Sequence, residues 1–259
     1  ARHLSCEGRR VLLVELQGKS SLQSLLALNS RPTYHPRTTE FGFDLALLTG
    51  IECLVEYVGS FTKLEGLTQK IFESSLLKSL VDVAPGLNDL SILGKLTSQF
   101  RGHGPGFDYD HVIVDAPSTG SFASLIKAPK TLGESVSPGP LRKQSMEIDR
   151  CLHDPELVQF FFMTLFEELP MDELEDTLAD FSDSFQKQIN VVANRHVSSF
   201  ASVTEGTSWS KFIGRKREQQ ELQSNRLKSL WENSLKFDLL LNPLKEELLS
   251  GSREALCPL

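Results

Sequence analysis

Short apolar runs recur along the chain, and polar or turn-forming stretches separate them. A continuous apolar run of this kind is typical of a strand in a parallel sheet, because helices cover both of its faces. The pattern predicts strands at residues 11–15, 43–48, 111–115, 160–165, 189–194 and 237–241. The run at 111–115 is the strongest strand signal among them.

Segments with helical character lie between these runs. They predict helices at residues 52–63, 68–79, 88–100, 171–186 and 211–235. Strands that alternate with helices of this length favour a doubly wound, mostly parallel sheet with helices on both faces, because parallel neighbours need a crossover connection. We therefore expect residues 1–259 to form a single α/β domain.

Glycine and proline punctuate the chain at several points. Residues 1–8 end on Gly8 and are typical of the closing turns of a helix with a glycine cap, so we expect the chain to be incomplete at its amino end. Residues 127–140 contain Pro129, Gly133 and a Pro-Gly-Pro run at 138–140. This composition predicts a long loop that is mobile or ordered by a ligand.

Charge and cysteine usage exclude some classes of function. The formal net charge of −7 at pH 7 disfavours a protein that mainly neutralises nucleic-acid phosphates or coats an anionic membrane. Cys6, Cys53, Cys151 and Cys257 form no C-x-x-C pair, so we expect neither a disulfide framework nor a zinc ribbon, and a cytoplasmic location. No run of about 18 apolar residues is present, so no membrane span is expected.

The strongest candidate for chemistry is Asp115, which closes the apolar run at 111–115 and precedes Ala-Pro-Ser-Thr-Gly at 116–120. P-loop nucleotidases use such a strand and turn to place a carboxylate near Mg²⁺ and a flexible backbone amide near the γ-phosphate. The alternative is an ordinary aspartate that caps a turn at the end of a strand. This segment alone does not separate the two.

Six segments, in order, resemble the ArsA-type family of anion-transporting and tail-anchored-protein-targeting ATPases, a deviant-Walker branch of the P-loop proteins. The resemblance covers nearly the whole chain. The matching segments are VLLVELQGKSS at 11–21, VAPGLNDL at 83–90, DAPSTG at 115–120, MTLFEELP at 163–170, VVANR at 191–195 and LNPLKEE at 241–247. The resemblance implies a P-loop NTPase-like α/β domain with a helical subdomain near residues 50–100.

The resemblance also implies a site for ATP or ADP with Mg²⁺. Asp115 would hold Mg²⁺ through a water molecule and Gly120 would sense the γ-phosphate. Asn194 would hydrogen-bond adenine, since one amide offers both a donor and an acceptor. Pro243 and Leu244 would form an apolar wall beside the base. The alternatives are an Asn194 that satisfies its own backbone, and core packing for Pro243 and Leu244.

Two departures from the family pattern concern the phosphates. The family's Walker A loop, G-K-G-G-V-G-K-[ST], is absent from the 259 residues, and without it no nest of amides and no lysine cradle the β- and γ-phosphates. ATPase activity is therefore expected on the condition that such a loop precedes Ala1.

Gln17 stands where the family carries the aspartate of its D-P-A-H segment. A neutral amide positions water but accepts no proton, so slow hydrolysis, or hydrolysis completed by a partner subunit, is expected.

These observations favour an ATPase that couples its nucleotide state to the conformation of a homodimer or heterodimer. The alternative is a catalytically weak or inactive nucleotide-binding subunit that pairs with an active paralogue. A weaker third reading is a partitioning ATPase of the MinD or ParA kind. Apolar residues at helical spacing in 52–63 and 64–80 predict a groove for a protein client or partner, with plain core packing as the alternative.

Overall fold

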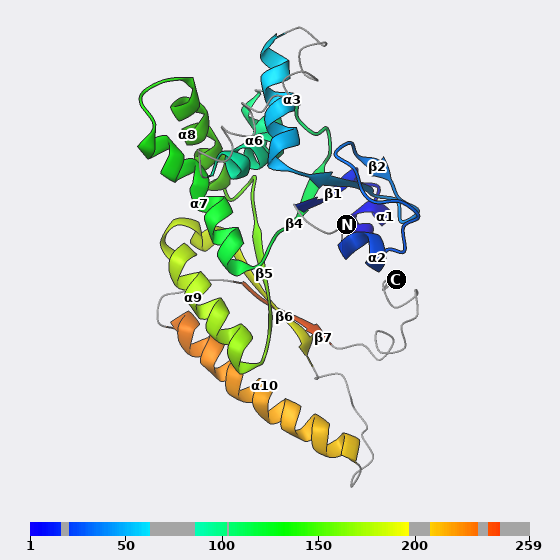
Figure 1. The fold of residues 1–259 in the computed structure, drawn as a ribbon. Helices are drawn as coiled ribbons and strands as arrows, with labels where there is room; N and C mark the ends of the chain where they lie inside the picture. Colours follow the sequence, from blue (N-terminus) through cyan, green and yellow to red (C-terminus); the bar gives the residue numbers. More distant parts are fainter. Residues whose placement is uncertain (17–20, 63–85, 103, 197–207, 233–237, 244–259) are drawn as a thin grey trace. The chain divides into compact units, whose positions relative to one another are not determined.

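The computed structural model describes residues 1–16, 21–62, 86–102, 104–196, 208–232 and 238–243. The chain divides into two compact units, Ala1–Leu152 and His153–Leu259, which are coloured from blue to green and from green to red in Figure 1. Among the described residues, no helix is long and apolar enough to cross a membrane.

The first unit is built on a four-stranded sheet with the order β2-β3-β1-β4. The strands β1 (Val11–Leu16), β3 (Asp44–Leu48) and β4 (His111–Asp115) are parallel, and the short β2 (Arg37–Thr38) is antiparallel to β3. In the central strand β1, Leu12 and Val14 are fully buried. The apolar run that predicts this strand therefore has its physical cause in burial between layers.

Helices precede β1 and follow each parallel strand of this unit. They are α1 (Arg2–Cys6), α2 (Ser21–Leu25), α3 (Gly50–Thr62), α6 (Leu87–Arg101), α7 (Thr119–Ser135) and α8 (Pro140–Leu152). The helices α3, α6, α7 and α8 pack against one another. At Gly50 the contact between α3 and α6 is so close that a Cβ atom would lie 2.7 Å from the Cα atom of Asn88.

The end of α1 confirms the predicted glycine cap. Gly8 has a φ angle of 80°, in the left-handed region. Its N–H donates to the Ser5 carbonyl at 3.0 Å, and the N–H of Arg9 donates to the Leu4 carbonyl at 3.1 Å. These two bonds are the Schellman arrangement, in which glycine adopts the left-handed backbone at low cost.

The second unit holds a three-stranded parallel sheet with the order β5-β6-β7. Its elements are β5 (Phe160–Leu165), α9 (Glu168–Phe185), a 3₁₀ turn at Gln186–Gln188, β6 (Ile189–His196), α10 (Ser208–Glu232) and β7 (Asp238–Pro243). Met171, Leu174, Leu178, Phe181 and Phe185 are buried along one stripe of α9, at the helical spacing of a core-facing stripe. The rings of Phe160 and Phe162 on β5 meet Phe181 edge to face.

The predicted α/β class agrees with a structure of mostly parallel sheets flanked by helices, and all six predicted strands are present. That the two sheets form one doubly wound sheet in a single domain stays a prediction. The helix predicted at 68–79 lies outside the described residues.

The prediction of a loop at 127–140 is wrong over most of that range, because helices occupy it. The helix α7 continues through Pro129 to Ser135, and α8 begins at Pro140. Leu125, Ile126, Ala128 and Pro129 are buried, so packing against α6 and α8 compensates for the backbone bond that proline removes. Pro140 stands at the first position of α8, where a missing N–H costs nothing.

Candidate functional site

The carboxyl ends of β1 and β4 bring two acidic residues together. The strands are parallel and in register, so Glu15 pairs with Asp115 across the sheet. Side chains at paired positions of parallel neighbours lie on the same face of the sheet. Glu15 is 5% exposed, whereas Asp115 is exposed. The sheet thus presents one buried and one open carboxylate at the edge where open α/β sheets bind their ligands.

Glu15 anchors the segment that follows its own strand. Its Oε1 atom accepts hydrogen bonds from the backbone N–H of Ser21 at 2.7 Å, from the Ser21 hydroxyl at 3.1 Å and from the N–H of Leu22 at 3.4 Å. These donors open α2, where backbone N–H groups lack helical partners and a negative charge is favourable. Glu15 therefore joins the end of β1 to the start of α2 across residues 17–20.

The environment of Asp115 raises the pKa of its carboxyl group above the usual value. The larger cause is the partial loss of hydration at the sheet edge, and the second is the negative charge of Glu15. Asp115 is exposed as a residue, so water screens part of the charge of Glu15. Two like charges at one edge favour the binding of a cation.

The helix α7 begins at Thr119, a short turn after Asp115. Ser118 is its N-cap residue and makes no side-chain capping bond. Gly120 lies in the first turn, where backbone N–H groups point out of the helix without helical partners. A Cβ atom at Gly120 would meet nothing within 4 Å, so space is open beside its backbone. A carboxylate followed by such a helix end can serve a metal ion and an anion together.

The residues present fit a hard divalent cation of the Mg²⁺ kind. Magnesium is usually held by one or two carboxylates together with water and substrate phosphates rather than by a complete cage of protein ligands. In the described ranges, no group of three or more His, Cys, Asp or Glu side chains forms a metal cage. The pair of carboxylates with an open edge matches the first arrangement.

Asn194 lies in the second unit, near the carboxyl end of β6. Its Oδ1 atom accepts the N–H of Arg195 at 2.9 Å, and Arg195 has a φ angle of 54°. The side-chain amide oxygen of Asn194 therefore binds the backbone of its own turn, as the alternative interpretation expects. Pro243 ends the neighbouring strand β7 opposite His196, so Asn194 and Pro243 lie near the same edge of this sheet. A shared contact with a base stays a prediction.

The structure does not reach two of the predicted site residues. Gln17 and Leu244 lie outside the described residues, and so their predicted roles stay predictions. Asp115 and Gly120 lie on consecutive elements of the first unit, in the order that the resemblance implies.

Sequence reasoning placed Glu15 in a strand but missed its interactions. The signal was present, because charged residues are almost never fully buried unless they are paired, and Glu15 interrupts an otherwise apolar run. What sequence alone does not show is that Ser21 and Leu22 return to this carboxylate.

Comparison with known proteins gives relatives but no family. No protein-family model matches the chain. It is 27% identical over 202 residues to the ATPase BagA of Mycobacterium tuberculosis (strain ATCC 25618 / H37Rv), and equally to a Mycobacterium bovis protein (strain ATCC BAA-935 / AF2122/97) named "Putative ATPase Mb3704". Each match covers 75% of this chain and 58% of the relative. The chain thus spans less than two thirds of the length of these curated relatives.

Proposed function

We propose that this protein binds Mg-ATP at the carboxyl edge of β1 and β4 and hydrolyses it slowly, in the manner of the ArsA-type ATPases. The observation that carries the proposal is the pairing of Glu15 with Asp115 directly before the exposed first turn of α7. The names of the mycobacterial relatives support ATPase activity in general. The ArsA type rests on the six segments quoted above.

Each residue has a limited task in this proposal. Mg²⁺, when bound, would neutralise phosphate charge. Asp115 would hold a water molecule of the cation, and the N–H of Gly120 would bind the terminal phosphate. Gln17 orients the attacking water without accepting its proton. Asn194 hydrogen-bonds adenine between the apolar walls of Pro243 and Leu244. Glu15 holds the start of α2, and with it the end of the segment that carries Gln17.

Three further parts of the proposal rest on the resemblance. The phosphates need a Walker A loop before Ala1. The nucleotide state changes the conformation of a dimer, formed with a second copy or with a paralogue. A protein client binds at the helical region that includes α3. The location that we propose is the cytoplasm, without stable membrane insertion and without a nucleic-acid partner.

Gln17 favours a second candidate function. Because a glutamine replaces the family's aspartate, the chain also suits the role of a nucleotide-binding subunit whose active paralogue completes hydrolysis. In that case ATP binds to the isolated protein, but its turnover does not exceed the background.

The experiment measures ATP binding and phosphate release by the complete gene product, including any residues encoded before Ala1. We expect Mg²⁺-dependent binding and slow release of phosphate, and we expect Gln17→Asp to increase the rate because it restores a proton acceptor. Binding without release by either form supports the partner subunit instead. No binding at millimolar ATP contradicts both candidates.

A further inference from the structure

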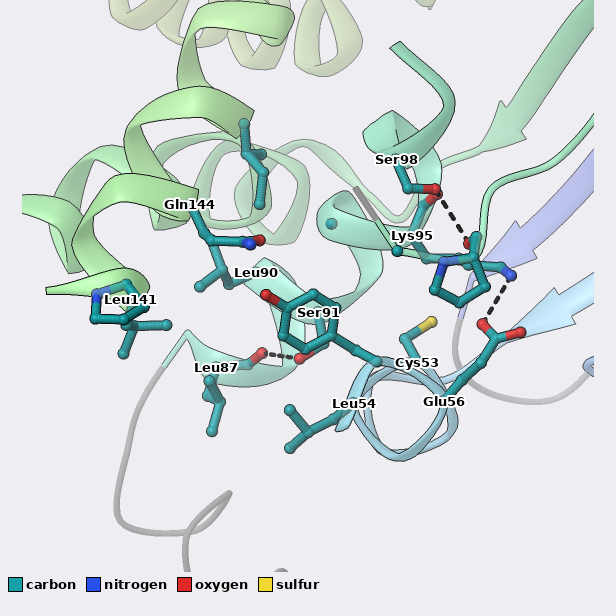
Figure 2. A pocket seen from close by; sticks show the side chains of 16 residues that line it. Cys53, Leu54, Glu56, Leu87, Leu90, Ser91, Lys95, Ser98, Leu141 and Gln144 are labelled. Carbon is teal, nitrogen blue, oxygen red and sulfur yellow. Dashed lines mark hydrogen bonds and ion pairs between the residues drawn. The ribbon is translucent and has the colours of Figure 1, made fainter. Parts of the chain in front are cut away.

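The first unit has a partly open cavity of about 430 Å³, and neither Glu15 nor Asp115 lines it. Figure 2 shows it between α3, α6 and α8. Gly104 and Pro105 also line it. Apolar side chains from all three helices line it, among them Leu54, Leu90, Leu141 and Ile148. The volume lies within the range of about 300–1,000 Å³ that is typical of small-molecule sites.

The charged side chains at the cavity are already paired within the protein. Nζ of Lys95 lies 2.7 Å from Oε2 of Glu56, which also accepts the hydroxyl of Tyr34. The same ammonium group lies 4.5 Å from the centre of the Phe107 ring. A charged ligand would have to displace one of these partners, and a carboxylate near Lys95 would face the carboxylate of Glu56.

The neutral polar groups of the lining are satisfied in the same way. The hydroxyl of Ser91 donates to the Leu87 carbonyl at 2.7 Å, and that of Ser98 donates to the Lys95 carbonyl at 2.7 Å. Oε1 of Gln144 accepts from Arg101 at 3.2 Å. Recognition in this cavity therefore depends on the burial of apolar surface rather than on new hydrogen bonds.

Cys53 does not convert the cavity into a reactive site. The thiol is 2% exposed, and burial raises its pKa to about 12. It stays protonated at neutral pH and is a poor nucleophile. An occupant of the cavity is therefore held without a covalent bond.

Gly94 on α6 lines the cavity beside Ile148 of α8. A Cβ atom at Gly94 would lie 3.6 Å from Cδ1 of Ile148. Lining residues extend along α6 from Leu87 to Ser98, about 16 Å at the rise of an α-helix. The cavity thus runs along much of α6, and its volume is that of a small molecule rather than of a protein helix about 10 Å wide.

We propose that this cavity binds the hydrocarbon chain of one uncharged lipid-like molecule. The length along α6, the apolar lining and the internally paired charges all favour a linear apolar chain over a charged ligand. The proposal does not depend on nucleotide binding, because the cavity and the Glu15–Asp115 edge share no lining residue.

The test uses N-phenyl-1-naphthylamine, an uncharged probe whose fluorescence rises in apolar sites, with the complete protein. We expect saturable binding that 1-dodecanol displaces at a concentration roughly tenfold lower than dodecanoate does, because the anion meets Glu56. Gly94→Leu fills the cavity and improves helix propensity; it should weaken probe binding by roughly tenfold or more. Gly214→Leu, at an exposed position of α10, is the matched control and should leave binding unchanged.

A second variant guards against misfolding of the first. Leu141→Asp places a charge on a side chain that is 43% exposed at the cavity, so it should weaken the probe while far-UV circular dichroism stays unchanged. Leu222→Asp, at a residue that is 67% exposed on α10, is its control. Absent probe binding, equal displacement by dodecanol and dodecanoate, or equal binding by all four variants would overturn the proposal.

Discussion

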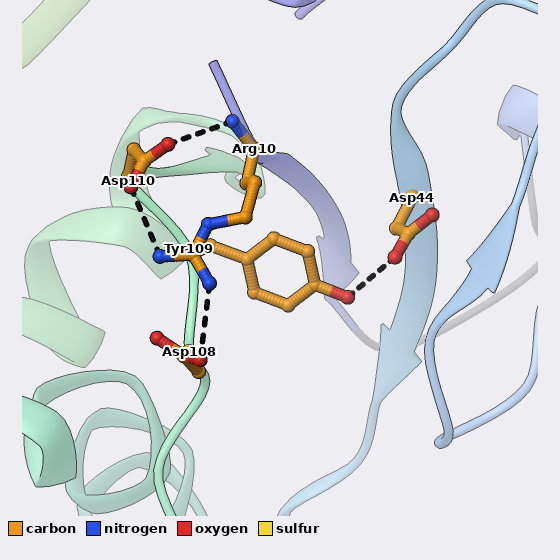
Figure 3. Close-up of polar contacts among 5 residues, drawn as sticks. All are labelled: Arg10, Asp44, Asp108, Tyr109 and Asp110. Atoms are coloured by element: carbon orange, nitrogen blue, oxygen red, sulfur yellow. Dashed lines mark hydrogen bonds and ion pairs between the residues drawn. The ribbon is translucent and has the colours of Figure 1, made fainter. Parts of the chain in front are cut away.

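The two ends of the strand pair β1 and β4 carry opposite arrangements of charge. At the amino end, the guanidinium of Arg10 lies 3.0 Å from Asp108 and 3.0 Å from Asp110. Tyr109 donates its hydroxyl to Asp44 on β3 at 2.6 Å (Figure 3). At the carboxyl end, Glu15 and Asp115 bring two like charges to neighbouring strands.

The pKa values of the two exposed aspartates shift in opposite directions. At the amino end, the backbone N–H and then the guanidinium of Arg10 hold the pKa of Asp110 below 3.8. At the carboxyl end, lost hydration and then Glu15 raise the pKa of Asp115 above 3.8. One end stabilises the strand register, whereas the other keeps an unfavourable charge that a cation would relieve. Shifts of the second kind are typical of functional sites.

The largest expected effect is on the rate of phosphate release, which should depend on the aspartate at the carboxyl end of the strand pair and not on the one at the amino end. Asp115→Asn should lower the rate of phosphate release by roughly 10–100-fold, as the loss of a group that acts on a metal through water does. Asp110→Asn, the same change at the opposite end, should leave the rate unchanged. Phosphate release at saturating Mg-ATP measures both. Equal rates for Asp115→Asn and the unaltered protein would show that Asp115 does not take part in the reaction.

The next effect tests the structural task of Glu15. Glu15→Ala removes the acceptor for the N–H groups of Ser21 and Leu22 and should lower the free energy of unfolding by about 1–2 kcal/mol. Glu15→Gln keeps an acceptor oxygen and should lose less. Urea denaturation followed by circular dichroism compares the two. If both variants were as stable as the unaltered protein, Glu15 would not fasten α2.

The elements that sequence predicted well are those in which local pattern and burial agree. The strands at 111–115 and 160–165 have the predicted bounds, and a polar residue, Asp110 or Gln159, directly precedes each run. The helix α7 was missed because Pro129 and Gly133 suggest a loop, whereas the burial of Ile126 and Ala128 holds the helix together. Packing between helices decided that case, and one sequence does not display it.

The candidate site also combines features that a local sequence pattern predicts with features that depend on the folded arrangement. The position of Asp115 at the end of β4 was predictable because a carboxylate that ends an apolar strand has a recognisable pattern, whereas its role in a site stays a prediction. Its pairing with Glu15 depends on the order β1-β4 in the sheet, which no local pattern contains. Asn194 was placed correctly on its strand, but the sequence indicated neither its bond to the N–H of Arg195 nor the positive φ angle of Arg195.

A smaller effect probes the electrostatic coupling of the two carboxylates. Glu15→Gln removes the negative charge that contributes to the raised pKa of Asp115. The pKa of Asp115 should therefore fall towards its usual value, and the acidic limb of the pH–rate profile should move to lower pH. The shift is small because lost hydration, the larger cause, remains. An acidic limb that stays in place would assign it to another group.

The smallest effect concerns stability in acid, where the two ends should respond with opposite signs. Because the pKa of Asp110 is lower in the folded protein, its ionised form stabilises the fold above pH 3.8, and this contribution is lost as the pH falls through the folded value. Because the pKa of Asp115 is raised, its ionised form costs stability at neutral pH, and protonation removes that cost.

At pH 7, Asp110→Asn should therefore lower Tm slightly, and Asp115→Asn should raise it slightly. Below pH 3.8 the unaltered protein should lose its advantage over Asp110→Asn. Thermal unfolding from pH 7 to pH 3 measures both variants, and parallel curves for all three proteins would show that the charges at these two ends do not differ in their effect on the fold.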